Sequence, residues 1–242
     1  QLSEAPLATT GRSVVNAVQS LPGWLLEANA VLHPRGSEYD TQYVVDGVAL
    51  LDNRSINYVP GFETSDLETI HVMTAGIPAE YGRRLGGVIE LNSRRAPAEG
   101  HHPEFGVGAG SYATKEVFAT EMYRKGPLAV TGSARGGFTD RYLDPPTLEN
   151  YTNRGSSSSG FLRVERDISP SDRLVLSGRA SQVKFLVPNE QVQQDAGQRQ
   201  DRDGRDVTGQ AHYQRILSPT AVVAIRGMAR DVRAELWSNP FA

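Results

Sequence analysis

Several residue types and patterns are missing from this chain of 242 residues, and each absence excludes a class of protein. There is no cysteine, which excludes a disulfide framework, a thiolate metal site and a cysteine nucleophile. The 25 basic and 28 acidic residues leave no excess of positive charge to hold a nucleic acid. No apolar run approaches the roughly 18 residues of a membrane-spanning helix, since the best candidate, 44–51, is interrupted by Asp46-Gly47. Membrane residence would therefore have to come from strands.

Residues 1–97 mix helical and strand periodicities, which predicts a compact α+β domain. Apolar residues at helical spacing after Ser13, a candidate cap, predict a short helix that Pro22-Gly23 ends. Strands are predicted at 42–48, 69–73 and 86–91, with a candidate helical turn at 65–68. Residues 97–103, with Gly100, His101 and His102, are predicted to form a linker.

Residues 98–242 show strand periodicity throughout, with apolar and polar residues in alternation. This pattern predicts seven strands, at 104–111, 114–123, 128–138, 159–167, 173–184, 206–216 and 221–232. One face of these strands is apolar and the other is polar. The apolar face carries Leu128, Val130, Val223 and Ile225, and the polar face carries Arg135, Gln210, Arg226 and Arg230.

The predicted connections alternate in length. Those at 124–127, 168–172 and 217–220 are short and contain proline, whereas 139–158 and 185–205 are long and polar. Short turns at one end and long loops at the other are typical of an outer-membrane barrel. The tight link at 111–113 is an exception, and the strands alone also allow an antiparallel sandwich or a soluble barrel.

A series of short strings runs through the first domain in a fixed order. They are His33-Pro34-Arg35-Gly36-Ser37-Glu38, Gln42-Tyr43-Val44-Val45-Asp46-Gly47-Val48, Leu67-Glu68-Thr69-Ile70-His71-Val72, Ala79-Glu80-Tyr81-Gly82-Arg83 and Gly86-Gly87-Val88-Ile89. In residue identity, order and spacing these strings resemble the plug of TonB-dependent outer-membrane receptors. The resemblance is strongest to the group whose upstream part carries a carboxypeptidase-regulatory-like domain. It covers residues 12–97 by these strings and 98–242 by architecture only.

The resemblance implies an α+β plug domain, residues 1–97, followed by antiparallel transmembrane β-barrel strands, residues 98–242. It also implies plug motif residues and plug–barrel contacts at Arg35, Gly36, Asp46, Gly47, Glu80, Tyr81, Gly82, Arg83, Gly86 and Gly87. We expect the arginines to pair with carboxylates across the plug or on the barrel wall. The alternatives are solvated charges for the arginines, ordinary turn positions for the glycines, and a strand-to-turn cap for Asp46.

The sequence offers little support for an enzyme. Glu63, Asp66 and Glu68 cluster, but they are best interpreted as charged turn residues. The histidines show no metal-ligand spacing, so we expect neither a metal site nor a cofactor. We interpret 156–159 as a flexible loop entering a strand, and 191–206 as a solvated extracellular loop.

We therefore expect an energised uptake receptor in the bacterial outer membrane, with its plug facing the periplasm and its strands in contact with lipid. The resemblance implies two further partners: the inner-membrane TonB complex, acting through a segment outside this chain, and an unknown solute. The alternatives are an outer-membrane adhesin or structural barrel without transport and, less favoured, a soluble β-rich carbohydrate-active enzyme. The chain has no signal peptide, no coupling box and no closing aromatic strand. We accordingly expect it to be a piece of a longer protein whose barrel has more strands than seven.

Overall fold

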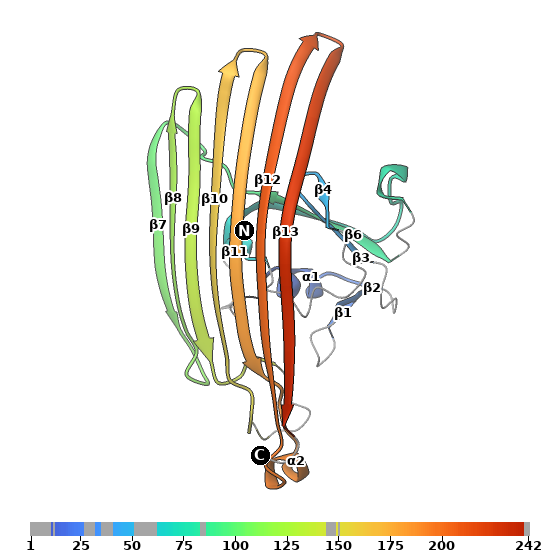
Figure 1. Cartoon of the computed structure of the whole chain (residues 1–242), viewed down its shortest axis with the longest axis vertical. Coiled ribbons are helices and arrows are strands. Elements are labelled where there is room, and N and C mark those ends of the chain that lie inside the picture. Colours follow the sequence, from blue (N-terminus) through green and yellow to red (C-terminus); the bar gives the residue numbers. More distant parts are fainter. Residues whose placement is uncertain are drawn as a thin grey trace.

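The computed structural model describes residues 11, 13–26, 32–34, 41–50, 62–82, 86–143, 149 and 151–239. These residues form two parts (Figure 1). One is a small mixed unit made of the described residues from Gly11 to Ser93, here called the amino-terminal unit. The other is a tall antiparallel sheet, β7–β13, here called the wall, and the unit lies against one of its faces.

The amino-terminal unit is built from short elements. They are α1 (Ser13–Gln19), β1 (Trp24–Leu26), β2 (Leu32–Pro34), β3 (Thr41–Val45), β4 (Val48–Ala49), the single-turn 3-10 helix η3 (Thr64–Asp66), β5 (Leu67–Met73), the 3-10 helix η4 (Ala79–Tyr81) and β6 (Gly87–Ser93). Strands β4, β3, β6 and β5 form one sheet in that order, with β3 and β6 parallel, while β1 pairs with β2. The predicted helix is present, as are the predicted strands at 69–73 and 86–91. The predicted strand 42–48 is wrong as a single strand, because the chain reverses at Asp46-Gly47 into β3 and β4. The helical turn predicted at 65–68 lies at 64–66 as η3, and 67–68 belong to β5.

The core of the unit explains why these residues fold locally. Val14 and Val18 are four residues apart on one face of α1, and both are buried. They join a cluster with Ile89 and Leu91, which alternate along β6 and are completely buried. Because β6 lies between β3 and β5, it has no edge exposed to solvent. Ser13 begins α1, but its hydroxyl donates to the carboxylate of Glu63.

The turn between β3 and β4 shows why the sequence needs Asp46-Gly47. Val45 and Val48 face each other as partners, so the turn has only two residues, and both have positive φ, 48° at Asp46 and 76° at Gly47. A two-residue hairpin turn with both central residues in the left-handed region favours Asp-Gly. This turn presents the Asp46 side chain to the wall.

The wall contains the seven predicted strands in sequence order, each antiparallel to its neighbours. They are β7 (Gly100–Ala109), β8 (Lys115–Lys125), β9 (Leu128–Thr139), β10 (Gly155–Ser169), β11 (Asp172–Leu186), β12 (Arg199–Ser218) and β13 (Ala221–Asn239). Two-residue turns join β8 to β9, β10 to β11 and β12 to β13 at one end of the sheet. The predicted alternation of short and long connections is thus confirmed. Among the described residues, β7 and β13 are the two edges of the sheet.

Three predictions about connections are wrong, all because the strands extend further than the alternation suggested. The linker is shorter than 97–103, since Gly100, His101, His102 and Pro103 belong to β7. Residues 156–159 lie inside β10 and are not a loop. Of the predicted loop 191–206, residues 191–195 form α2 (Gln191–Asp195) and 199–206 belong to β12. Pairing with neighbouring strands holds these polar stretches in the sheet.

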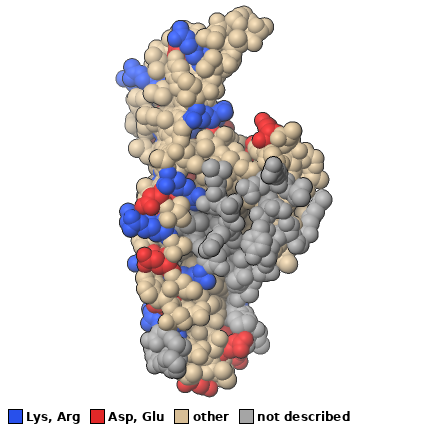
Figure 2. Space-filling view, turned by 45° about the vertical axis from the view of Figure 1, so that its right-hand side comes forward, with Lys and Arg blue, Asp and Glu red and all other residues tan. Residues whose placement is uncertain are grey.

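The two faces of the wall differ as predicted. The outer face, directed away from the amino-terminal unit, exposes large apolar side chains such as Phe105 and Ile225, which are 80% and 63% exposed. On the inner face, Arg135 approaches Glu63 and Gln210 donates to the backbone oxygen of Val45. The predicted strand register is therefore confirmed at these positions. In Figure 2, basic and acidic side chains of the face shown are interleaved along the sheet rather than gathered by sign.

The outer apolar surface runs obliquely across the strands. Ile225 on β13 is opposite Tyr213 on β12, which is opposite Leu174 on β11. This row continues through Arg166 on β10 to Leu128 on β9. The row through the exposed Phe105 on β7 reaches β13 at Asp231, which lies further from the short turns than Ile225. An oblique band is what strands tilted through a flat apolar layer require. No helix in the described part of the chain is long and apolar enough to cross a membrane.

Candidate functional site

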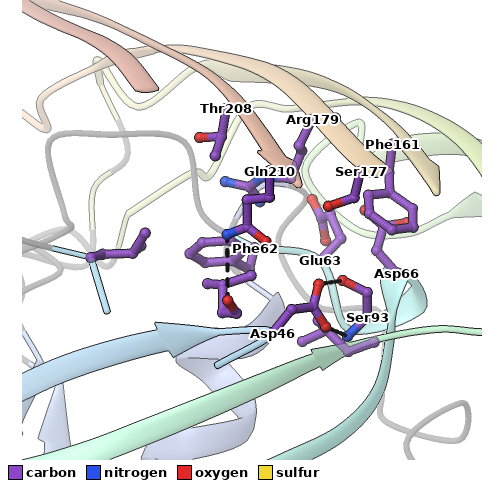
Figure 3. Close-up of a pocket in the computed structure, with 14 residues that line it drawn as sticks. Asp46, Phe62, Glu63, Asp66, Ser93, Phe161, Ser177, Arg179, Thr208 and Gln210 are labelled. Atoms are coloured by element: carbon purple, nitrogen blue, oxygen red, sulfur yellow. Dashed lines mark hydrogen bonds between the residues drawn. The ribbon is translucent and has the colours of Figure 1, made fainter. Parts of the chain in front are cut away.

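Three carboxylates of the amino-terminal unit face the inner side of the wall: Asp46, Glu63 and Asp66. Asp46 comes from the β3–β4 turn, Glu63 directly precedes η3, and Asp66 ends it. Figure 3 shows them between the unit and the wall, with Arg179 and Gln210 of the wall reaching toward them. The interface is the candidate functional site because it is where the two parts of the chain are held together.

Asp46 forms the first link. Its carboxylate accepts hydrogen bonds from the backbone N–H of Ser93, at 2.9 Å, and from the Ser93 hydroxyl, at 2.5 Å. The same carboxylate lies 3.3 Å from Nη1 of Arg163 on β10. Arg163 is buried and also donates to Glu165 at 2.7 Å. Asp46 is thus anchored in its own unit and at the same time compensates a buried arginine of the wall.

Glu63 forms the second link and is almost completely buried, with 2% of its surface exposed. It accepts hydrogen bonds from the Gly11 N–H and the Ser13 hydroxyl, each at 2.6 Å. Arg135 of β9 lies 4.0 Å away and also faces Glu116. Burial raises the pKa of Glu63, and the Ser13 hydrogen bond and Arg135 oppose that rise without cancelling it.

Asp66 forms the third link by accepting a hydrogen bond of 2.5 Å from the Ser133 hydroxyl of β9. Burial raises its pKa, while the Ser133 hydrogen bond and the charge of Arg179 act in the opposite direction. The guanidinium of Arg179 lies over the ring of Phe62, 3.7 Å from its centroid, and 3.6 Å from Asp206. It thus faces both the unit and the wall.

The resulting interface is an alternating network of charges. Buried ion pairs of this kind contribute little net stability, because desolvation offsets the attraction, but removing one partner leaves an uncompensated charge and costs about 3–5 kcal/mol. Water can replace each polar contact if the unit moves. Met228 of β13 is the wall residue among those described that packs against the apolar core of the unit.

The structure places the predicted site residues in three groups. Asp46 and Gly47 lie at the interface, the latter beside Arg226 of β13. Gly82 has positive φ, and Tyr81 donates to Glu90 within the unit, which together with burial raises the pKa of Tyr81 to about 12. Glu80 is exposed.

The remaining predicted residues serve packing or lie outside the described residues. Gly86 and Gly87 are buried, and a Cβ at Gly87 would lie 3.0 Å from the Trp24 ring and 3.2 Å from the Met73 carbonyl oxygen. Gly87 thus permits close packing inside the unit. Arg35, Gly36 and Arg83 lie outside the described residues. Their pairing with carboxylates stays a prediction.

Two functional residues were assigned incorrectly from the sequence. Glu63 and Asp66 were expected to be charged turn residues, yet they are buried against the wall. In the pairs Glu63–Arg135 and Asp46–Arg163 the carboxylate belongs to the unit and the arginine to the wall. Arg94, directly after β6, instead pairs with Glu104 of β7, which is the arrangement expected for Arg35 and Arg83. Alternation along 159–167 and 173–184 could have identified Arg163 and Arg179, since each shares its face with buried apolar residues. In the part of the chain that the structure describes, no three His, Asp or Glu side chains converge as a metal site would require.

Comparisons with known proteins identify a similar fold among solved structures. No family model matches the sequence, and no curated protein matches it. Among solved structures, the alcaligin outer-membrane receptor FauA from Bordetella pertussis superposes with a TM-score of 0.74 at 14% identity, over 98% of this chain and 38% of that one. The FrpB iron transporter from Neisseria meningitidis superposes with a TM-score of 0.73 at 14% identity, over 98% of this chain and 40% of that protein. The siderophore receptor PirA from Pseudomonas aeruginosa superposes with a TM-score of 0.66 at 16% identity, over 97% of this chain and 39% of that protein. At such identities the likeness shows the fold, and this chain spans about two fifths of the length of each of these proteins.

Proposed function

We propose that this chain, which has the fold of TonB-dependent outer-membrane receptors, functions as part of such a receptor. Residues 1–97 are its plug and 98–242 the first strands of its barrel, in the outer membrane, with the plug facing the periplasm. External loops capture a scarce solute, and the inner-membrane TonB complex displaces the plug to admit it.

The observation that carries this proposal is the contrast between the two faces of the wall. The outer face exposes Phe105, Val107 and Ile225 along an oblique band, which suits contact with lipid. The inner face meets the amino-terminal unit mainly through charged and hydrogen-bonded side chains such as Arg163 and Arg135. A plug must be docked specifically and still be able to leave. Polar links that water can replace, around a core that is local to the unit, satisfy both needs.

The same observation bears on the alternatives. A soluble carbohydrate-active enzyme would have to keep the outer apolar band in water, which favours aggregation. An adhesin or structural barrel accounts for the band but gives no role to a separate unit held by buried carboxylates. Transport is thus the better explanation. Adhesion can be tested by measuring the attachment of the same strains to surfaces.

The solute is proposed by class only. The proteins of similar fold are named as receptors for alcaligin, for siderophores or for ferric enterobactin, or as an iron transporter. Ferric siderophores are therefore the first probes, followed by cobalamin, oligosaccharides and peptides.

The test is uptake by intact cells. A strain lacking the gene for this protein is compared with its parent and with a complemented strain, using radiolabelled hydroxamate and catecholate ferric siderophores, then labelled cobalamin and oligosaccharides. We expect one label to be taken up by the parent and the complemented strain and lost in the deletion strain. A parent lacking TonB should show the same loss.

Two outcomes would contradict the proposal. Uptake that depends on this gene but persists without TonB would remove the energised mechanism. Unchanged uptake of all labels, together with reduced attachment of the deletion strain to surfaces, would establish the adhesin instead. Outer-membrane fractionation of the tagged protein checks the location independently.

A further inference from the structure

A polar cavity of about 210 Å³ lies between the β3–β4 turn and the wall, on the side of the interface nearer the short turns. Its lining includes the Asp46-Gly47 turn and Arg95 from the unit side, and Arg163, His212 and Arg226 from β10, β12 and β13. A water molecule occupies about 30 Å³ in the liquid, so the cavity has room for a small polyatomic ion with some of its hydration.

Arg226 is the residue that makes this cavity unusual. Its guanidinium lies against Gly47, where an added Cβ would be 3.4 Å from both Cζ and Nε. The nearest carboxylate of the turn, Asp46, is engaged by two donors of Ser93 and by Arg163. No carboxylate in the described part of the chain forms an ion pair with Arg226. Its charge is directed to the cavity without a compensating anion.

Two more donors surround the same space. Nε2 of His212 is buried and has no hydrogen-bond partner among the described residues. A buried polar nitrogen without a partner costs free energy, which a bound acceptor would recover. Arg95 is held only by an exposed ion pair of 3.7 Å with Glu68, an arrangement of small net value. Both side chains are therefore available to an acceptor in the cavity.

The charges of the cavity lining do not balance. The lining contains three arginines, Arg95, Arg163 and Arg226, and one carboxylate, Asp46. Glu165 compensates Arg163 from the adjoining position on β10. Asp46 also pairs with Arg163, and Glu68 pairs with Arg95 at 3.7 Å, so Arg226 is the lining arginine without a carboxylate partner among the described residues. Its charge faces a space partly shielded from bulk water, where a charge-assisted hydrogen bond is stronger than at an open surface.

We propose that this cavity binds an oxyanion, a phosphate or carboxylate group, held by Arg226 and Arg95 with His212 as a further donor. Arg226 supplies the planar fork that matches two oxygens of such a group. The site is a property of the docked unit and wall, and it can be measured as binding whether or not the protein transports anything. If the proposed transport holds, the site lies in the interface that opens when the plug moves.

The test is equilibrium binding to the full-length protein in detergent, by titration calorimetry at constant ionic strength. The probes are inorganic phosphate, acetate and, as a neutral control, glucose. We expect phosphate or acetate to bind and glucose not to bind. Arg226→Gln should weaken anion binding about ten-fold or more, because a charged donor pair is removed. The anion affinity of Arg226→Lys should lie between those of Arg226→Gln and the parent protein, since lysine keeps the charge but lacks the planar guanidinium.

The matched control is Arg205→Gln, which removes the same charge from the outer side of the neighbouring strand β12. It should leave anion binding unchanged. If Arg226→Gln does not fold, as judged by heat-modifiable migration, Arg95→Gln at the exposed rim replaces it and should weaken binding several-fold. Absence of anion binding by the parent protein overturns the proposal. So does equal affinity in the parent and the Arg226→Gln or Arg95→Gln variant.

Discussion

Glu63 offers the sharpest test of how the amino-terminal unit is held on the wall. Replacing it by alanine removes the acceptor of two hydrogen bonds of 2.6 Å, from the Gly11 N–H and the Ser13 hydroxyl, and deprives Arg135 of one of its two carboxylates. Each donor left unpaired in a buried place costs about 1–3 kcal/mol. Because both donors belong to the unit, the stability of the unit should fall by about 2–6 kcal/mol, and the weakened contact with Arg135 adds to this loss.

The assay uses Trp24, which is buried in the unit. The fluorescence difference between the full-length protein and its Trp24→Phe variant isolates the Trp24 signal and so reports on the unit. Urea titration of the full-length protein in detergent, followed by Trp24 fluorescence, should show the transition of the unit at lower urea in Glu63→Ala. The wall should keep its heat-modifiable migration.

The control is Glu68→Ala, which removes an exposed carboxylate whose ion pair with Arg95 is 3.7 Å long. It should change the stability by less than about 1 kcal/mol. Equal urea midpoints for Glu63→Ala and Glu68→Ala would refute the view that the buried Glu63 carboxylate stabilises the unit against the wall. A larger effect of Glu68→Ala would point to the exposed side of the unit as the true contact.

Four further predictions follow from the same geometry. Burial raises the pKa values of Glu63 and Asp66, so the folded unit binds protons more readily than the unfolded chain. The stability of the unit should therefore rise as pH falls from neutral toward the ordinary carboxyl range, and it should decline as pH rises through the raised pKa values. Urea midpoints at pH 7.5 and 5.5 check this, and a lower midpoint in acid would contradict it. Val223→Arg should lower the stability of the barrel in bilayers by about 2–4 kcal/mol. Spin labels at Val223 and Ile225 should report lipid, whereas labels at Arg226 and Arg230 should report water or protein. The opposite pattern would mean that the assigned register is wrong by one residue. Gly87→Ala should destabilise the unit by about 1–3 kcal/mol, because its Cβ would meet Trp24 at 3.0 Å, and an unchanged Trp24 transition would show that the ring can move aside. Residues 12–97 alone should be soluble and monomeric, whereas residues 98–242 alone should aggregate through the unpaired edges of β7 and β13; a detergent-stable monomer of the latter would count against the barrel interpretation.

Features encoded by local periodicity could be predicted from the sequence. Alternation along each segment determined the seven strands and their faces, because side chains on a strand point to opposite sides in turn. Val223 and Ile225 are exposed while Arg135 faces the unit for this reason. The hairpin turn at Asp46-Gly47 was missed inside the predicted strand 42–48, although Asp-Gly favours the left-handed backbone that a two-residue hairpin needs.

The strand ends could not be predicted in this way. Residues 199–205 are polar on both faces and carry no alternation, yet they continue β12 because β11 and β13 supply hydrogen-bond partners on both sides. The same applies to the serines at 156–159, which pair with β9 and β11.

Only the tertiary structure decided which charges meet. Glu63 and Asp66 belong to a short acidic stretch that is indistinguishable in sequence from a solvated turn, and their partners Arg135 and Ser133 lie on a strand of the other part of the chain. Asp46 meets Arg163 in the same manner, and Arg226, which has no carboxylate partner among the described residues, lies over its turn. Local patterns determine the face on which a side chain lies, whereas the docking of the amino-terminal unit on the wall determines what lies opposite it, and a charge becomes buried only when that docking removes its water.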